Sequence, residues 1–155
     1  MLAQNGGQML KELDIPPSWL GLGLLVRWAL SRIWSLQGLS GLGAVLIGLG
    51  ALLLLAAVAQ MLAAGTSFVP RRDPAALVTG GVFQISRNPI YLADAMLLTG
   101  FIAYWGAVLA LPVIPAFITL ITRRYVHDEE ARLRNRFGAA AEAYFAAVPR
   151  WIWRF

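Results

Sequence analysis

Long apolar stretches alternate with charged segments along the chain. Apolar residues dominate 15–36, 39–64 and 89–122, and the last stretch is interrupted near Tyr104, Trp105 and Gly106. The 39–64 stretch carries no charge and is long enough to cross roughly 30 Å of hydrocarbon. Because the interruption divides 89–122 into two apolar halves, the pattern predicts about four transmembrane helices.

The segments between and after these stretches are polar. Residues 1–14 form a polar N-terminus, 66–88 a loop rich in Arg, Pro and Gly, and 123–155 a charged, helix-prone tail. If all four stretches span, these segments share one side of the membrane and carry nearly all the basic residues. The positive-inside rule then places both termini in the cytoplasm. We therefore predict one domain, 1–155, an all-α integral membrane protein of the bacterial inner-membrane type with a cytosolic C-terminal helical cap.

The first apolar stretch contains Arg27 well inside its length. A charge near the bilayer centre costs at least about 2.5 kcal/mol. The stretch therefore either spans the membrane, which is the preferred interpretation, or lies in the interface plane as an amphipathic helix. If it spans, Asp94 in the third stretch is the predicted partner of Arg27.

Composition excludes several classes of protein. Hydrophobic residues make up 59% of the 155 and charged residues only 14%, whereas soluble domains are nearer half apolar and a quarter charged. The net charge of +5 comes almost entirely from arginine, and anionic lipid headgroups explain it better than nucleic acid does. With no cysteine and a single histidine, His127, we expect no metal site.

Small residues recur in the uncharged 39–64 stretch. Gly41, Ala44, Gly48 and Ala51 follow one another at spacings of three and four, which puts them on one helix face. Such a face lets a second membrane helix approach closely. We predict that these four residues form a helix-packing surface.

Two polar segments could hold a ligand. In the first, Arg87 and Asn88 precede Pro89, which suits a first helical turn that Asn88 can cap. The free N–H groups of that turn suit a polar ligand, although a plain membrane-helix start remains the alternative. In the second, Arg124 and Glu130 lie about a turn and a half apart on a helix. Such a cluster could hold a polar cofactor, although stabilisation of the helix start explains part of the acidic run.

Taken in order, these segments resemble a known group of membrane enzymes. One motif runs from 77–83 into Arg87-Asn88-Pro89-Ile90-Tyr91, and the other joins Glu129-Glu130 to Leu133, Phe137-Gly138, Tyr144 and Val148-Pro149. The chain is similar to the isoprenylcysteine carboxyl methyltransferases and phospholipid methyltransferases over roughly 15–151, and most strongly over 66–151. The resemblance implies S-adenosylmethionine as cofactor, bound between the last membrane helices and the cytosolic tail.

The resemblance also implies roles for individual residues. Arg124 resembles a cation near the reacting end of the family's substrate. Apart from the resemblance, an amine or thiol acceptor needs a base, and His127 is the one candidate that can act at neutral pH. Arg124 and His127 are therefore the predicted catalytic residues. The predicted cofactor-binding residues are Val82, Phe83, Arg87, Asn88, Pro89, Tyr91, Leu92, His127, Glu129 and Glu130.

Some positions depart from the family pattern. Val82-Phe83 stands where Pro-Tyr is common, Ala141 where a tyrosine is often found, and Ala93-Asp94 where a glycine is usual. The predicted function is methyl transfer to a lipophilic or membrane-associated acceptor, with a carboxylate, amine or thiol all open. Besides lipids and this substrate no partner is predicted. The alternatives are a small four-helix transporter and a membrane assembly subunit without chemistry.

Overall fold

The computed structural model describes residues 15–34 and 38–152, and all regular secondary structure within these ranges is helical. The predicted polar N-terminus, 1–14, and the end of the first apolar stretch lie outside the described residues. The α-helices are α2 (Pro16–Ser31), α3 (Ser40–Ala63), α4 (Pro89–Tyr104), α5 (Val113–Ile121), α6 (His127–Phe137) and α7 (Ala139–Ala147). Short 3-10 helices, η1 (Gly81–Gln84) and η2 (Val108–Ala110), precede α4 and α5, and a π-helical turn, η3 (Thr122–Val126), joins α5 to α6.

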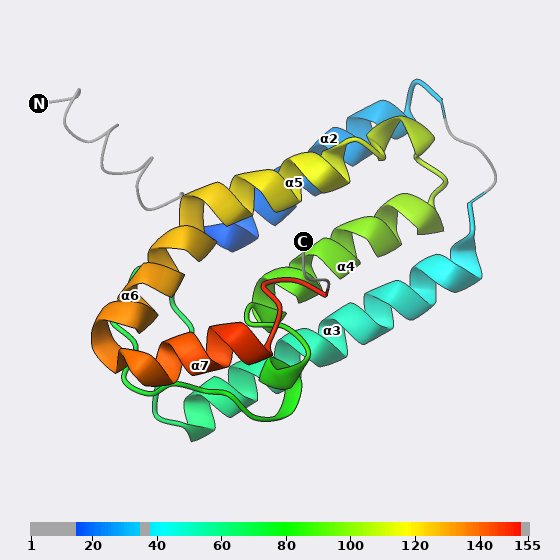
Figure 1. Cartoon of the computed structure of the whole chain (residues 1–155). Helices are drawn as coiled ribbons and strands as arrows, with labels where there is room; N and C mark the ends of the chain where they lie inside the picture. Colours follow the sequence, from blue (N-terminus) through cyan, green and yellow to red (C-terminus); the bar gives the residue numbers. More distant parts are fainter. Residues whose placement is uncertain (1–14, 35–37, 153–155) are drawn as a thin grey trace, which may run out of the picture.

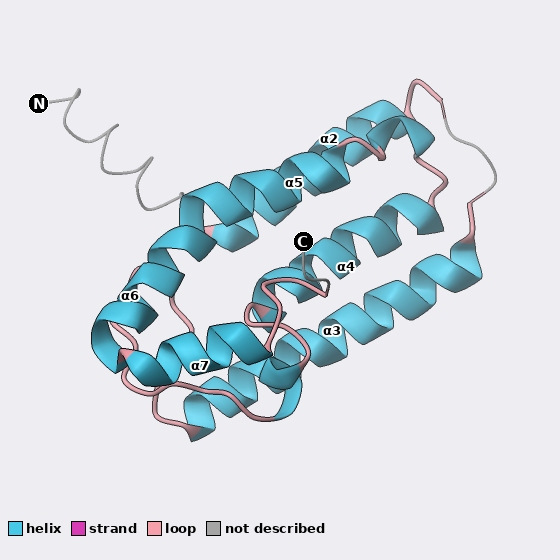
Figure 2. Ribbon diagram, viewed as in Figure 1, coloured by secondary structure: helices cyan, strands magenta, loops and turns pink. Residues whose placement is uncertain are grey.

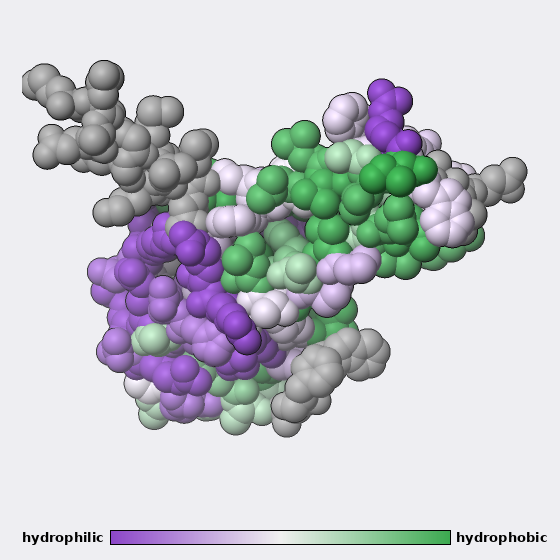
Figure 3. All heavy atoms as spheres, turned by 90° about the horizontal axis from the view of Figure 1, so that it is seen from above, coloured by the Kyte–Doolittle hydropathy of each residue, from purple (hydrophilic) through white to green (hydrophobic). Residues whose placement is uncertain are grey.

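The helices form a bundle with a cap at one end. Helices α2, α3, α4 and α5 run alongside one another, and α6 and α7 fold back over one end of this bundle (Figures 1 and 2). On the face drawn in Figure 3, hydrophilic residues gather at one end and hydrophobic residues cover most of the rest. The prediction of an all-helical protein is confirmed for the described residues.

Among the described residues, two helical runs are long and apolar enough to cross a membrane. They are α3 and the continuous run Val108–Phe137, which contains α5 and leads into the cap. Helices α2 and α4 have 16 residues each, so each is about 24 Å long, short of the roughly 30 Å hydrocarbon layer. The number of spans and the side on which the cap lies stay predictions.

Helices α3 and α4 pack through small residues, but not through the predicted ones. Gly43, Gly50 and Ala57 are buried, and a Cβ atom at Gly43 would lie 2.5 Å from the backbone nitrogen of Tyr104. The predicted face was wrong, since added Cβ atoms at Gly41 and Gly48 would meet nothing within 4 Å. Uniform hydropathy around α3 explains the error, because a helix without charge offers several equivalent small-residue faces.

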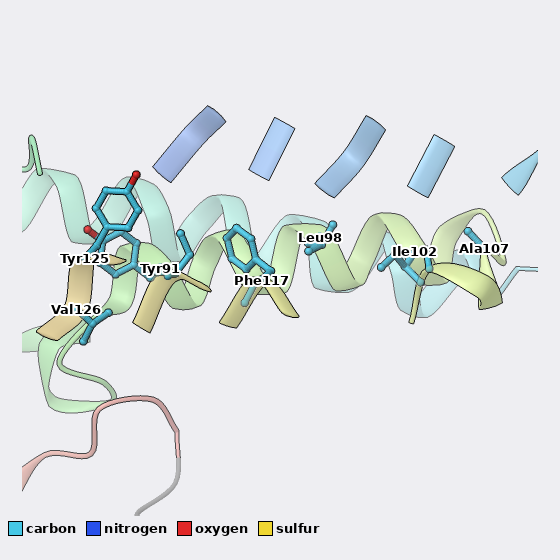
Figure 4. Close-up of a cluster of buried hydrophobic side chains, with 10 residues drawn as sticks. Tyr91, Leu98, Ile102, Ala107, Phe117, Tyr125 and Val126 are labelled. Atoms are coloured by element: carbon cyan, nitrogen blue, oxygen red, sulfur yellow. The ribbon is translucent and has the colours of Figure 1, made fainter. Parts of the chain in front are cut away.

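The interruption of the 89–122 stretch is confirmed. Trp105 ends α4, and Gly106 follows with a φ of +61°, a left-handed conformation that glycine adopts at little cost. The chain then reverses, so α5 returns beside α4 and α2. A cluster of buried side chains fills the space between them, from Tyr125 and Tyr91 at the capped end to Leu98, Ile102 and Ala107 (Figure 4).

Arg27 does not pair with Asp94. Its guanidinium carbon lies 4.6 Å from the ring centre of Trp105, and no ion pair joins it to Asp94 within the described residues. Trp105 follows Asp94 by eleven residues, which is about 16 Å along a helix. The predicted pair is therefore wrong, and a cation–π contact at the end of α4 takes its place.

Candidate functional site

Residues 86–88, just before α4, are bonded to residues 149–150, just after α7. The amide of Arg87 donates to the carbonyl of Pro149 at 3.0 Å. The hydroxyl of Ser86 and the side-chain amide of Asn88 both donate to the carbonyl of Arg150, each at 3.0 Å. We call these contacts the clasp. Asn88 does occupy the N-cap position of α4, but the predicted side-chain capping bond is wrong, because its amide is engaged in the clasp.

A buried carboxylate lies beside the clasp. Glu130 is 2% exposed and accepts two hydrogen bonds from Arg150, Nε to Oε1 at 2.9 Å and Nη2 to Oε2 at 2.7 Å. Nη2 of Arg87 lies 3.4 Å from Oε1 of the same carboxylate. Burial alone would raise the pKa of Glu130, but the Arg150 hydrogen bonds and the Arg87 charge outweigh it and lower the pKa. Glu130 therefore holds two guanidinium groups together in its ionised form.

The neighbouring acid, Glu129, has a different partner. The Tyr91 hydroxyl donates to Oε1 of Glu129 at 2.5 Å, which ties the start of α4 to α6. Burial raises the pKa of Glu129, against the lowering effects of the Tyr91 hydrogen bond and of Arg132. The ring of Tyr91 lies 6.2 Å from that of Tyr125, whose hydroxyl accepts from the indole of Trp19 at 3.0 Å.

A polar cavity of about 640 Å³ opens between the end of α5 and the segment that follows α7. Its lining combines three guanidinium groups, an imidazole, two hydroxyls and two aromatic rings. These are Arg87, Arg123 and Arg150, His127, Thr119 and Thr122, and Phe145 and Trp151, with Ile118, Ala146, Val148 and Pro149 completing the wall. No carboxylate lines it among the described residues, so it favours anionic groups. Nε of Arg87 is buried and makes no hydrogen bond.

The structure brings some predicted residues to this cavity and buries others behind it. Arg87 and His127 line it. Asn88 and Glu130 bind Arg150, which lines the cavity. Pro89, Tyr91 and Leu92 are buried in α4. Phe83 is buried and Val82 half-buried in a second apolar cluster with Tyr144 and Val148. The Tyr144 hydroxyl donates to the Phe83 carbonyl at 2.7 Å, and burial raises the pKa of Tyr144 to about 12.

The two predicted catalytic residues do not share a cavity. The guanidinium carbon of Arg124 lies 5.8 Å from the ring centre of Trp19, and Arg124 lines a separate cavity of about 610 Å³ beside α5. His127 lines the polar cavity. Arg123, which is not among the predicted site residues, lines both cavities.

Arg150 was also missed. It directly follows the Val148-Pro149 pair of the second motif, and this position next to the motif is the one feature of the sequence that could have identified it as a site residue. Its importance depends on the return of the chain to residues 86–88, because that contact brings its guanidinium to Glu130.

Comparison with known proteins identifies the family of this chain. No curated protein and no solved structure is significantly similar to this chain. A family model described as phospholipid methyltransferase matches residues 39–140, which is more than half of the chain and includes Arg87, Arg123 and Glu130. Membrane methyltransferases make up this family, and the predicted resemblance is confirmed. The chain therefore belongs to the phospholipid methyltransferase family.

Proposed function

We propose that this protein is an S-adenosylmethionine-dependent methyltransferase that binds its cofactor in the polar cavity and methylates a lipophilic acceptor at the membrane surface. The observation that carries the proposal is the lining of the cavity, in which Arg87, Arg123 and Arg150 meet hydroxyl and aromatic side chains and no carboxylate of the described residues takes part. Guanidinium groups are the natural partners of carboxylates, so this lining suits the carboxylate of the cofactor.

The lining fits the other parts of the cofactor. A volume of about 640 Å³ lies in the range of small-molecule sites. Trp151 offers aromatic surface for an adenine ring, and Thr119 offers a hydroxyl to ribose. The Phe145 ring is already in contact with the guanidinium groups of Arg87 and Arg134, at 4.6 and 4.8 Å. The hydroxyl of Thr122 already accepts from the indole of Trp151 at 3.2 Å, which orients that ring at the mouth of the cavity.

Bound cofactor supplies an electrophilic methyl group, which passes to an acceptor lone pair while the electrons of the broken carbon–sulfur bond stay with sulfur. The protein's task is chiefly to align the two molecules. We assign the carboxylate of Glu130 to positioning, since its contacts fix Arg87 and Arg150. An acceptor carboxylate needs no base, whereas an amine or thiol gives up a proton, for which His127 lines the cavity.

The proposal also keeps the predicted membrane arrangement. Residues 1–155 act as one unit, α2 to α5 span the membrane and both termini face the cytoplasm. The cap formed by α6 and α7 then lies where the soluble cofactor is available. The transporter alternative calls for paired repeats as well as an ionisable group within the spans, and the sequence contains no internal repeat.

Calorimetric titration of S-adenosylmethionine into detergent-solubilised protein tests the proposal. We expect Arg87→Gln to weaken binding about 10- to 100-fold, as for a lost charged hydrogen bond. Arg136→Gln is the matched control, because Arg136 is exposed on α6 and lines neither cavity. Absence of binding at millimolar cofactor, in protein with a native near-ultraviolet spectrum, would refute the function. Equal affinity in wild type and Arg87→Gln would remove Arg87 from the site.

A further inference from the structure

Basic and aromatic side chains gather at the end of the bundle opposite to the cap. At this end α2 finishes at Ser31, α4 finishes at Tyr104 and α3 begins at Ser40 (Figure 1). Arg27 lies four residues before the end of α2, which is about 6 Å along a helix, and Arg32 directly follows that end. We call these two arginines and the aromatic residues in contact with them the distal cluster, and its aromatic members are Trp28, Phe101, Tyr104 and Trp105.

Each arginine of the distal cluster lies over an aromatic ring. The guanidinium carbon of Arg27 is 4.6 Å from the ring centre of Trp105, and that of Arg32 is 5.3 Å from the ring centre of Trp28. Phe101 stacks on Trp105 with ring centres 5.3 Å apart, which fixes the ring that carries Arg27. A ring face attracts a cation but brings no negative charge, and neither arginine makes a hydrogen bond or ion pair within the described residues.

No acidic side chain lies near enough to balance this charge in the described part of the chain. The described residues of α2 to α5 contain one acid, Asp94, which lies eleven residues before Trp105, about 16 Å along α4. All other described acids belong to the 66–88 loop or to α6 and α7. The carbonyl ends of α2 and α4 attract cations, but phosphate is a stronger partner for the planar guanidinium fork.

The aromatic residues indicate that this end lies at a membrane interface. Trp28, Tyr104 and Trp105 are exposed, and Trp and Tyr collect where the hydrocarbon meets the head groups. Helices α2 and α4, with 16 residues each, are about 24 Å long, and a short helix draws the nearby head groups inward by thinning the bilayer. Lipid phosphates are thereby brought to the level of Arg27 and Arg32.

We propose that the distal cluster binds the phosphate of an anionic phospholipid in the leaflet opposite to the cap. Arg27 and Arg32 donate to its phosphate oxygens, and its acyl chains lie along the exposed apolar side chains of α2, Leu22, Leu25 and Val26. This lipid is a structural partner and not a methyl acceptor, since the length of the bundle separates the distal cluster from the polar cavity at the capped end. The inference rests on the proposed membrane arrangement and does not depend on methyl transfer.

Native mass spectrometry of the full chain in neutral detergent tests the inference. The probes are phosphatidylglycerol, phosphatidylcholine and diacylglycerol with identical acyl chains. The first carries an uncompensated phosphate charge, the second pairs its phosphate with its own ammonium group, and the third has no phosphate. We expect phosphatidylglycerol to bind about tenfold or more tightly than the other two. Equal binding of all three would overturn the inference.

Variants separate the distal cluster from general surface charge. We expect Arg27→Gln and Arg32→Gln each to weaken binding of phosphatidylglycerol about tenfold, with partial recovery in Arg32→Lys. Arg32 is exposed beyond the end of α2, so its replacement keeps the fold even where that of Arg27 does not. The matched control is Arg136→Gln, at an exposed position of α6, which should leave binding unchanged. Unchanged binding in Arg32→Gln, or an equal loss in Arg136→Gln, would overturn the inference.

Thiol labelling tests the membrane arrangement separately. The chain contains no cysteine, so a single introduced thiol reports its own position. Ser40 is exposed at the end that holds the distal cluster, and Glu142 is 60% exposed in the cap. In intact bacterial cells we expect a membrane-impermeant maleimide to label Ser40→Cys and not Glu142→Cys. Labelling of both refutes the membrane arrangement and the inference with it, whereas the expected labelling with equal binding of the three lipids refutes the lipid site alone. Neither result bears on cofactor binding, which Arg87→Gln tests.

Discussion

Replacing Glu130 by Gln tests the arginine cluster on which the site rests. Glutamine keeps the shape of the side chain and one acceptor oxygen, but its NH₂ group can only donate. One of the two Arg150 hydrogen bonds, at 2.9 and 2.7 Å, is therefore lost. The side chains of Arg87 and Arg150, 12% and 34% exposed, then face each other with no anion between them.

The expected cost follows from these contacts. Breaking a buried ion pair by removing one partner costs about 3–5 kcal/mol, and a hydrogen bond to a charged group about 1.5–3 kcal/mol. Water reaches a third of the Arg150 side chain, so we take the lower end, about 3 kcal/mol. The chain contains a matched control, since Arg134 and Glu142 also meet at 2.8 Å but are 45% and 60% exposed. Glu142→Gln should therefore cost less than about 1 kcal/mol.

Hydrogen exchange at the Arg87 amide measures this cost directly. That amide donates to the Pro149 carbonyl, so it exchanges only when the clasp opens or the whole chain unfolds. We expect its opening free energy to fall by about 3 kcal/mol in Glu130→Gln. A fall of less than about 1 kcal/mol, no larger than that in Glu142→Gln, would show that Glu130 does not hold the clasp.

Three further predictions concern pH, a buried hydroxyl and helix packing. The pKa of the Glu130 carboxyl is lowered in the folded protein. The stability that this carboxylate contributes is therefore complete above the ordinary glutamate pKa of about 4.3 and is lost as the pH falls below that value. Exchange at the Arg87 amide should show this loss in wild type and not in Glu130→Gln. Tyr144→Phe removes the hydroxyl that donates to the buried Phe83 carbonyl and should lower the free energy of unfolding, measured by denaturant titration, by about 1–3 kcal/mol. Tyr104→Phe is the control, because Tyr104 is 40% exposed, and should leave the free energy of unfolding nearly unchanged. Gly43→Ala places a Cβ atom 2.5 Å from the Tyr104 backbone and should lower the free energy of unfolding by about 1–3 kcal/mol. Gly41→Ala, with open space around it, should leave it unchanged or raise it by up to about 1 kcal/mol in the same unfolding titration with sodium dodecyl sulfate.

The sequence predicts the helices well because their ends carry local signals. Pro89 begins α4, Gly106 follows its end, and Gly138, with a φ of +52°, separates α6 from α7. Each signal acts through backbone conformation and needs no information about the rest of the chain. The all-helical fold and the interruption after Tyr104 could therefore be predicted from single residues.

Contacts between helices could not be predicted in the same way. Hydropathy does not distinguish the face of α3 that carries Gly43 and Gly50 from the one that carries Gly41 and Gly48, because both faces are apolar. Arg27 had Asp94 as its only acidic candidate within the apolar stretches, yet the helix offset brings it to Trp105. Register between helices decides both cases, and it depends on packing along their whole length.

The candidate site also contains residues that the sequence motifs identify and residues that they do not. Arg87 and Glu130 belong to the part of the chain that matches the family, whereas Tyr144, Phe145, Arg150 and Trp151 follow the match, which ends at residue 140. One wall of the polar cavity thus comes from matched residues and the opposite wall from the segment after them. Since Glu130 and the clasp hold the second wall against the first, we expect substitutions after residue 140 to change cofactor affinity as strongly as those in the matched motifs. Residues from both parts of the chain line the cavity, so neither wall forms it alone.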